Sequence, residues 1–225
     1  MNTSYFLIII IGIAGLIVQA KLQSVIKKYS REFFPGGHTG KDVAEKMLRD
    51  HGIYDVQVVA TRGILTDHYN PKNRTVNLSE NVYSGCSISA AAVAAHECGH
   101  AIQHAQGYAP LRLRSALVPV IQYSSIFSTW VVIAGVLLIN TLPAIFWVGI
   151  AMIAASALFS IVTLPVEYNA SRRALAWLEN TKTLSPEQMK GATISLRWAA
   201  STYLVAAISA IASLLYYLGY APDRD

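Results

Sequence analysis

Charged residues are scarce in this chain. They make up 14% of its 225 residues, whereas hydrophobic residues make up 53%, and an ordinary soluble domain is about 25% charged. The scarcity is concentrated in four uncharged runs, at residues 5–20, 116–142, 144–166 and 198–220. A membrane span needs about 20 apolar residues, with about 17 the lower limit. The last three runs meet this length and the first is marginal, so we expect an integral membrane protein with about four transmembrane helices.

The first run also lacks the basic residues that precede the apolar core of a secretory signal. Met1 to Ser4 carries no basic side chain, and Lys21, Lys27, Lys28 and Arg31 follow the run instead. A cleaved signal needs its positive region before the apolar core. We therefore expect residues 1–20 to be a retained transmembrane anchor.

Basic residues are nearly absent from one side of the predicted membrane topology. Seventeen of the 18 Lys and Arg residues fall in segments 21–115 and 167–197, and Arg224 is the exception. The positive-inside rule then places both polar segments in the cytoplasm of a multi-pass cell-membrane protein. The basic segments contain no aromatic or Gly-rich recognition elements, so no nucleic-acid partner is expected.

Cysteine is equally scarce, and the sequence has no internal repeat or low-complexity tract. The two cysteines, Cys86 and Cys98, fall in a predicted cytoplasmic segment, where thiols stay reduced. We interpret both as free, structural residues, so no disulfide is expected.

The polar segments show a mixed pattern of helices and strands. Helices are predicted at 21–32, 41–50 and 88–106, the last with Ser87 as its N-cap, and the third span should continue as a helix to residue 180. Residues 56–60 are β-rich, and 62–69 and 74–78 read as two antiparallel strands joined by a turn at 70–73. A capping box at Ser185 and Gln188 should begin the helix that leads into the last span.

The Ala-rich helix carries the motif His96-Glu97-Cys98-Gly99-His100. Positions i and i+4 lie on one helix face, so both imidazoles can reach one metal ion. Glu97 is displaced by about 100° around the axis, where its carboxylate can take a proton from a water without being a ligand. This arrangement predicts a zinc site with Glu97 as the catalytic base.

A catalytic zinc ion takes three protein ligands and keeps one position open. His104 is the nearest candidate, but three histidines at i, i+4 and i+8 spread over about 12 Å of helix axis, far more than zinc–nitrogen bonds allow. Glu167 stands at the end of the third span, where an acid is costly without a partner. We therefore predict Glu167 as the third ligand and His104 as a supporting residue, the alternative for Glu167 being a surface ion pair with Arg172 or Arg173.

Four blocks of sequence resemble the membrane neutral zinc metallopeptidases of the YugP type. They are Leu65-Thr66-Asp67-His68-Tyr69-Asn70-Pro71, Leu78-Ser79-Glu80, the stretch from Ala94 to His104, and the stretch from Pro165 to Leu175. The resemblance runs over nearly the whole chain. It implies a zincin-like cytoplasmic domain with zinc on His96, His100 and Glu167, and with Glu97 as base. The chain has Asn169 where the family commonly has an acid, and Ser171 where related zincins often have Asp.

The strands next to the motif are candidates for substrate binding. In a zincin, an edge strand beside the metal pairs with an extended substrate through backbone hydrogen bonds. Asp67, His68 and Tyr69 could orient the ligands or stabilise an oxyanion. The alternative is a purely structural turn fixed by the Asp67 side chain.

These observations predict a mainly α-helical membrane protein with a small α+β zincin-like cytoplasmic domain. The expected divisions are an anchor at 1–20, a catalytic segment at 21–115, a transmembrane hairpin at 116–166, a segment supplying the third ligand at 167–197, and a last span with a short tail at 198–225.

The predicted activity is peptide-bond hydrolysis with one catalytic zinc ion. Glu167 directly follows an uncharged span, so the metal should lie close to the lipid bilayer and favour membrane-associated polypeptides. One alternative is an intramembrane protease, which the polar residues on both sides of the motif helix disfavour. The other is a non-hydrolytic membrane scaffold or chaperone that keeps zinc for stability. The sequence does not indicate the oligomeric state.

Overall fold

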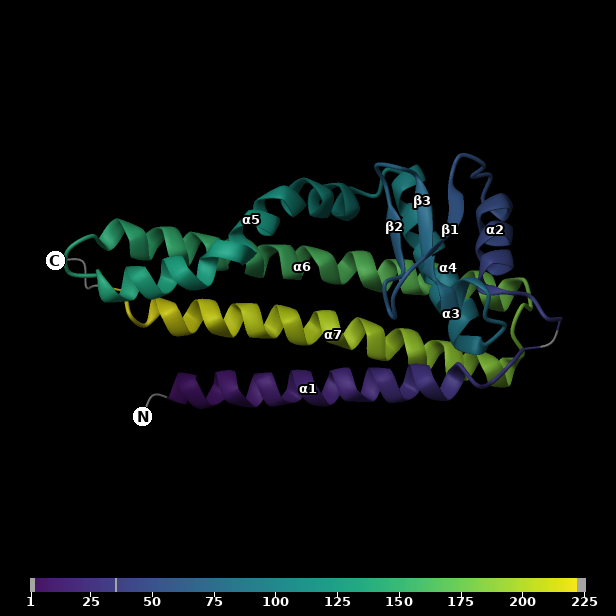
Figure 1. Cartoon of the computed structure of the whole chain (residues 1–225), viewed down its shortest axis with the longest axis horizontal. Coiled ribbons are helices and arrows are strands. Elements are labelled where there is room, and N and C mark those ends of the chain that lie inside the picture. Colours follow the sequence, from purple (N-terminus) through teal and green to yellow (C-terminus); the bar gives the residue numbers. More distant parts are fainter. Residues whose placement is uncertain (1–2, 35, 222–225) are drawn as a thin grey trace. The chain divides into compact units, whose positions relative to one another are not determined.

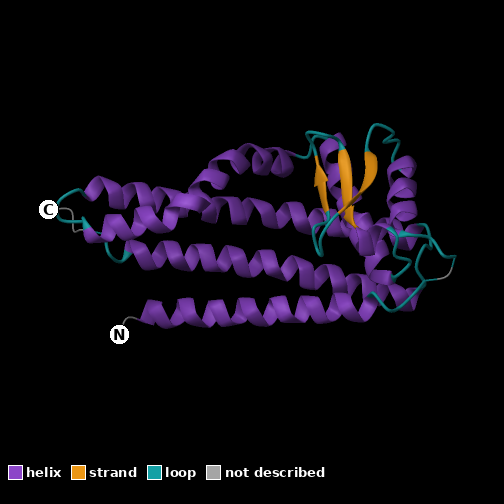
Figure 2. Ribbon diagram, viewed as in Figure 1, coloured by secondary structure: helices purple, strands orange, loops and turns teal. Residues whose placement is uncertain are grey.

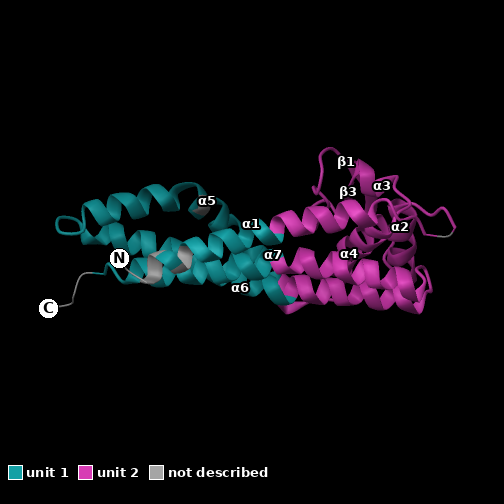
Figure 3. Cartoon of the chain, turned by 90° about the horizontal axis from the view of Figure 1, so that it is seen from below, with its two compact units in different colours: residues 1–18, 112–165, 202–225 teal, residues 19–111, 166–201 magenta. Residues whose placement is uncertain are grey.

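The computed structural model describes residues 3–34 and 36–221 and is mainly helical, with one small sheet (Figures 1 and 2). The elements in chain order are α1 (Thr3–Tyr29), α2 (Gly40–Asp50), β1 (Gln57–Thr61), β2 (His68–Asn70), β3 (Thr75–Ser79), α3 (Glu80–Tyr83), α4 (Ile88–Ala105), α5 (Ala109–Leu137), α6 (Pro143–Asn180) and α7 (Pro186–Leu218). They form two compact units, coloured separately in Figure 3. The first holds the described residues up to Val18, Arg112–Pro165, and those from Thr202 onward; the second holds Gln19–Leu111 and Val166–Ser201.

The first unit is built from long apolar helices. Three helices are long and apolar enough to cross a membrane, at Ile9–Tyr29, Pro143–Asn180 and Pro186–Leu218. The two parts of α5, Ala109–Ser124 and Ile126–Leu137, are bent by 55° and make a fourth if they form one span. Three or four spans therefore agree with the number expected from the uncharged runs.

Helices α1, α6 and α7 each run through both units. The helix expected separately at 21–32 is the C-terminal part of α1, which continues to Tyr29. The expected continuation of the third span is confirmed, because α6 runs unbroken past Pro165 to Asn180. Glu167 therefore lies on the same helix as the third apolar run.

Local capping fixes where the helices of the second unit begin. The hydroxyl of Ser87 accepts a hydrogen bond from the backbone N–H of Ala90, so the expected N-cap of α4 is confirmed. The expected capping box of α7 is also present, with Ser185 N–H donating to Gln188 Oε1 at 3.0 Å and Gln188 N–H donating to Ser185 Oγ at 3.3 Å. Thr39 caps α2 in the same way.

The sheet has the strand order β1-β3-β2. β2 pairs antiparallel with β3, Asn70 lying opposite Thr75, and β1 pairs parallel with β3. The strand expected from residue 62 is wrong over most of its length, because only His68–Asn70 pairs. Gly63 and Leu65 have φ values of 107° and 57°, which no β-strand contains.

Helix α4 lies in the middle of the second unit and is buried almost throughout. Its alanines at 91, 92, 94 and 95 are fully buried, so elements pack closely on several of its faces. One close approach is at Gly99, where a Cβ atom would lie 2.7 Å from the carbonyl oxygen of Ala170 on α6. This backbone contact sets the separation between the motif helix and the helix that carries Glu167.

Candidate metal centre

Three side chains from α4 and α6 converge in the second unit. His96 Nε2 lies 3.2 Å and His100 Nε2 lies 3.6 Å from Glu167 Oε2. One candidate ligand atom from each residue lies within 4.8 Å of the other two, so this trio could hold a metal ion. The i, i+4 spacing places the two imidazoles on one face of α4, and the contact at Gly99 brings the Glu167 carboxylate up to them.

A buried glutamine orients His100. Gln103 Oε1 lies 3.0 Å from His100 Nδ1, and because an amide oxygen only accepts, Nδ1 carries the proton and donates. The lone pair of His100 is therefore on Nε2, the nitrogen that faces Glu167. Gln103 is itself held by α6, since its Nε2 donates to the Val166 carbonyl at 2.8 Å and to Asn169 Oδ1 at 3.0 Å.

His96 is oriented from α6 as well. Ser171 Oγ lies 3.1 Å from His96 Nδ1, leaving Nε2 directed at Glu167. Asn169 Oδ1 also accepts a hydrogen bond from Arg173 Nε at 2.7 Å. Asn169 and Ser171 thus support the histidines with neutral side chains.

Glu97 lies beside this trio but is not part of it. Its side chain is buried, and burial raises the pKa of its carboxyl to about 7, against the opposing influence of His96. The backbone of Tyr69 on β2 acts in the same direction as His96 and lowers the pKa of this carboxyl. A carboxyl with a pKa near neutrality can both accept and return a proton under ordinary conditions.

The remaining predicted residues lie around the β2 strand. Asp67 accepts hydrogen bonds from Ser79, at 2.7 Å from its backbone nitrogen and 3.0 Å from its hydroxyl, which is the structural role left open by the sequence. His68 is exposed, and its Nδ1 lies 2.8 Å from the Thr66 carbonyl. Tyr69 Oη lies 2.7 Å from Nδ1 of His104, which is exposed and outside the metal-ligating trio.

Sequence reasoning missed Gln103 as a site residue. Glutamine is common in helices, and nothing local marks this one, because its partners Val166 and Asn169 are more than 60 positions away. The signal that could have found it is its position: it lies three residues after His100, so it shares that helix face.

The donor set fits zinc. Two imidazole nitrogens and one carboxylate oxygen are ligands that zinc accepts, and three protein ligands leave one coordination position open. Hydrogen bonds fix both histidines from behind, as is usual for metal-binding imidazoles.

Comparison with known proteins points the same way. A family model described as "Putative neutral zinc metallopeptidase" matches residues 4–221. The "Putative membrane protease YugP" of Bacillus subtilis (strain 168) is 40% identical over 215 residues, which are 95% of this chain and 95% of that protein. No solved structure matches the chain. Because the family model spans nearly the whole chain, this protein belongs to the neutral zinc metallopeptidase family that the model describes.

Proposed function

We propose that the protein is a membrane-anchored metallopeptidase that hydrolyses peptide bonds, with one zinc ion on His96, His100 and Glu167 and with Glu97 as general base. The observation that carries the proposal is the convergence of two imidazoles and one carboxylate within 4.8 Å, with a second buried carboxyl beside them. When bound there, zinc supplies Lewis acidity, which polarises a carbonyl group and lowers the pKa of water.

The protein's own groups then carry out the proton transfers. Glu97 accepts a proton from the attacking water as the oxygen of that water bonds to the scissile carbonyl carbon. The carboxylic acid formed on Glu97 returns the proton to the leaving amine when the carbon–nitrogen bond breaks. Water is thus added across the peptide bond, and Glu97 ends the cycle ionised.

The substrates proposed are polypeptides that are embedded in, or held at, the cytoplasmic face of the cell membrane. Glu167 lies on α6, whose earlier residues form an uncharged run from 144 to 166, and this supports a metal site close to the bilayer. A tethered substrate has a raised effective concentration at such a site. In proteoliposomes, a cleavable sequence placed just beyond a transmembrane helix should be cut faster than the same sequence on a soluble carrier, and equal rates would contradict this preference.

The proposed reaction is tested with the purified full-length protein loaded with zinc. Wild-type protein should hydrolyse polypeptides, and Glu97→Gln should lose turnover by at least about 1000-fold while retaining zinc, because only the base is removed. Zinc bound at full stoichiometry without hydrolysis by the wild type would instead favour the non-hydrolytic scaffold. Near wild-type turnover by Glu97→Gln would contradict the assigned mechanism.

A further inference from the structure

Glu97 belongs to a row of residues along α4 that are spaced four apart, namely Ser89, Val93, Glu97, Ala101 and Ala105. Residues at this spacing form a continuous ridge on a helix. The two ends of the row line two different cavities of the second unit, and Glu97 lies between them. We call these the apolar cavity, next to Val93, and the polar cavity, next to Ala105.

The apolar cavity has a volume of about 330 Å³, and the surface that its wall exposes is mainly carbon. Polar residues such as Gln23, Lys27 and Asp67 line it together with five aliphatic side chains. The aliphatic side chains come from α1, the loop before β2, α3 and α4, and are Ile26, Ile64, Leu65, Val82 and Val93. Ile64 is 79% exposed at its rim, and Leu65 is held there at a φ of 57°. These two side chains give the cavity an apolar rim, which an apolar side chain of a bound peptide would cover.

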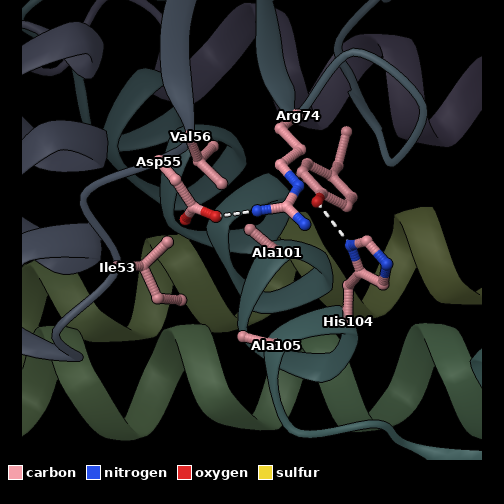
Figure 4. A pocket seen from close by; sticks show the side chains of 8 residues that line it. Ile53, Asp55, Val56, Arg74, Ala101, His104 and Ala105 are labelled. Carbon is pink, nitrogen blue, oxygen red and sulfur yellow. Dashed lines mark hydrogen bonds and ion pairs between the residues drawn. The ribbon is translucent and has the colours of Figure 1, made fainter.

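The polar cavity also has a volume of about 330 Å³, and two polar pairs face it (Figure 4). One is the Arg74–Asp55 ion pair, and the other is the hydrogen bond between Tyr69 Oη and His104 Nδ1. Ala101 and Ala105 contribute only methyl groups, which leaves the space open. The cavity therefore offers donors and acceptors to a side chain of moderate size.

The strand β2 connects the two cavities. Asp67, directly before β2, lines the apolar cavity, and Tyr69 within β2 lines the polar cavity. Among the described residues β2 pairs with β3 alone, so its other edge is free to pair with an extended chain. The hydrogen bond between Tyr69 Oη and His104 Nδ1 shows that β2 lies against α4, the helix that carries the proposed base.

From this arrangement we infer that the enzyme selects its substrate at two positions, one on each side of the scissile bond: an apolar side chain enters the apolar cavity and a polar side chain enters the polar cavity. The inference rests on the proposed peptidase function. Val93 and Ala101 are eight residues apart, or about 12 Å along α4. An extended chain covers about 3.3 Å per residue, so the two selected side chains should lie about three to four positions apart.

The test profiles cleavage of a mixed-sequence peptide library by the zinc-loaded full-length protein. Val93→Phe fills the apolar cavity. Relative to peptides with a small side chain at the substrate position that enters this cavity, it should reduce cleavage of peptides with a large aliphatic one by about tenfold. Val93→Ala enlarges the cavity and should favour larger side chains at the same substrate position. Ala105→Leu fills the polar cavity and should change preference only on the other side of the scissile bond. Val58→Ala, in β1 and outside both cavities, is the matched control and should leave the profile unchanged.

The possible outcomes distinguish a failure of this inference from a failure of the proposed peptidase function. Wild-type protein that cuts no member of the library overturns the proposed function and the inference together. Normal cleavage with an unchanged profile in both Val93 variants overturns the inference alone. A profile that shifts at the same substrate position for Val93→Phe and Ala105→Leu also overturns it, because the cavities would not lie on opposite sides of the scissile bond.

Discussion

Glu167 and His104 lie near the same histidine pair, but only Glu167 faces it. The Glu167 oxygen is 3.2 Å from His96 Nε2, whereas His104 contacts Tyr69 instead. Glu167→Gln should therefore lower zinc affinity by more than about 100-fold. Loss of a residue that only supports a ligand typically lowers metal affinity by about 10- to 100-fold. His104→Ala should lower it by less than about tenfold.

Zinc content of the two purified variants, measured by atomic absorption after dialysis against a weak chelator, gives the comparison. Equal zinc loss from both variants would contradict the assignment of Glu167 as the third ligand.

The motif residues themselves are predictable from spacing alone, because i and i+4 neighbours meet on any helix. Glu167 required a second argument, from the cost of an acid beside an apolar helix.

Gln103 shows where such reasoning ends. It is fully buried, and its amide joins His100 on α4 to two acceptors on α6. Hydrogen bonds across two helices depend on how those helices pack, which no local pattern encodes. The same applies to Ser171, whose contact with His96 arises only after α6 docks on α4.

Replacing this glutamine should weaken metal binding without touching a ligand. Gln103→Leu removes the acceptor that fixes His100 and leaves the Val166 carbonyl without its donor, so zinc affinity should fall by about 10- to 100-fold. Gln106→Leu, at the exposed C-cap of α4, is the matched control. Calorimetric titration of the metal-free proteins with zinc measures both, and equal affinities in the two variants would mean that Gln103 does not position His100.

The contact between α4 and α6 depends on the absence of a side chain at Gly99. A Cβ atom there would lie 2.7 Å from the Ala170 carbonyl oxygen and 3.0 Å from its Cα atom, and backbone cannot move aside as a flexible side chain can. Gly99→Ala should therefore separate the helices, destabilise the fold by about 1–3 kcal/mol and weaken zinc binding.

Gly12→Ala is the control with the opposite expected sign. A Cβ atom at Gly12 meets no atom within 4 Å, and alanine stabilises a helix by about 0.5–1 kcal/mol relative to glycine. Thermal unfolding in detergent, together with zinc content, compares the two. A Gly99→Ala protein as stable as Gly12→Ala, with full zinc, would show that the close helix contact is not required.

The elements differ in how far the sequence predicts them. Helices α2 and α4 follow from apolar periodicity and capping residues, which act within a few positions, and α6 follows from its long uncharged run. The sheet follows from the sequence only in part. The antiparallel pairing of β2 with β3 across a short turn was expected and is confirmed. The parallel pairing of β1 with β3 was not predicted, because it joins segments separated along the chain and is set by packing. The strand predicted from residue 62 is too long, because Gly63 and Leu65 have positive φ values. The β-propensity of a sequence does not predict such a backbone conformation.

For the molecule as a whole, the distribution of basic residues predicts that the second unit faces the cytoplasm. Single cysteines at Lys72, in the turn between β2 and β3, and at Thr141, between α5 and α6, test this in a background with Cys86→Ser and Cys98→Ala. In intact cells an impermeant thiol reagent should label Thr141→Cys and spare Lys72→Cys until the cells are lysed. The reverse labelling pattern would show that the second unit faces the outside of the cell.

The second unit is assembled from two separated parts of the chain, Gln19–Leu111 and Val166–Ser201, and this division sets an order of events during synthesis. When the ribosome has made α4, the nascent chain contains both histidines and the proposed base but not Glu167, Ser171 or Asn169. Those residues arrive only with α6, after the apolar segment that precedes Glu167 has been made. A chain that ends before α6 thus carries two of the three proposed ligands and cannot hold its metal in the proposed way. The dependence on α6 would keep the proposed peptidase inactive until most of the chain has been made.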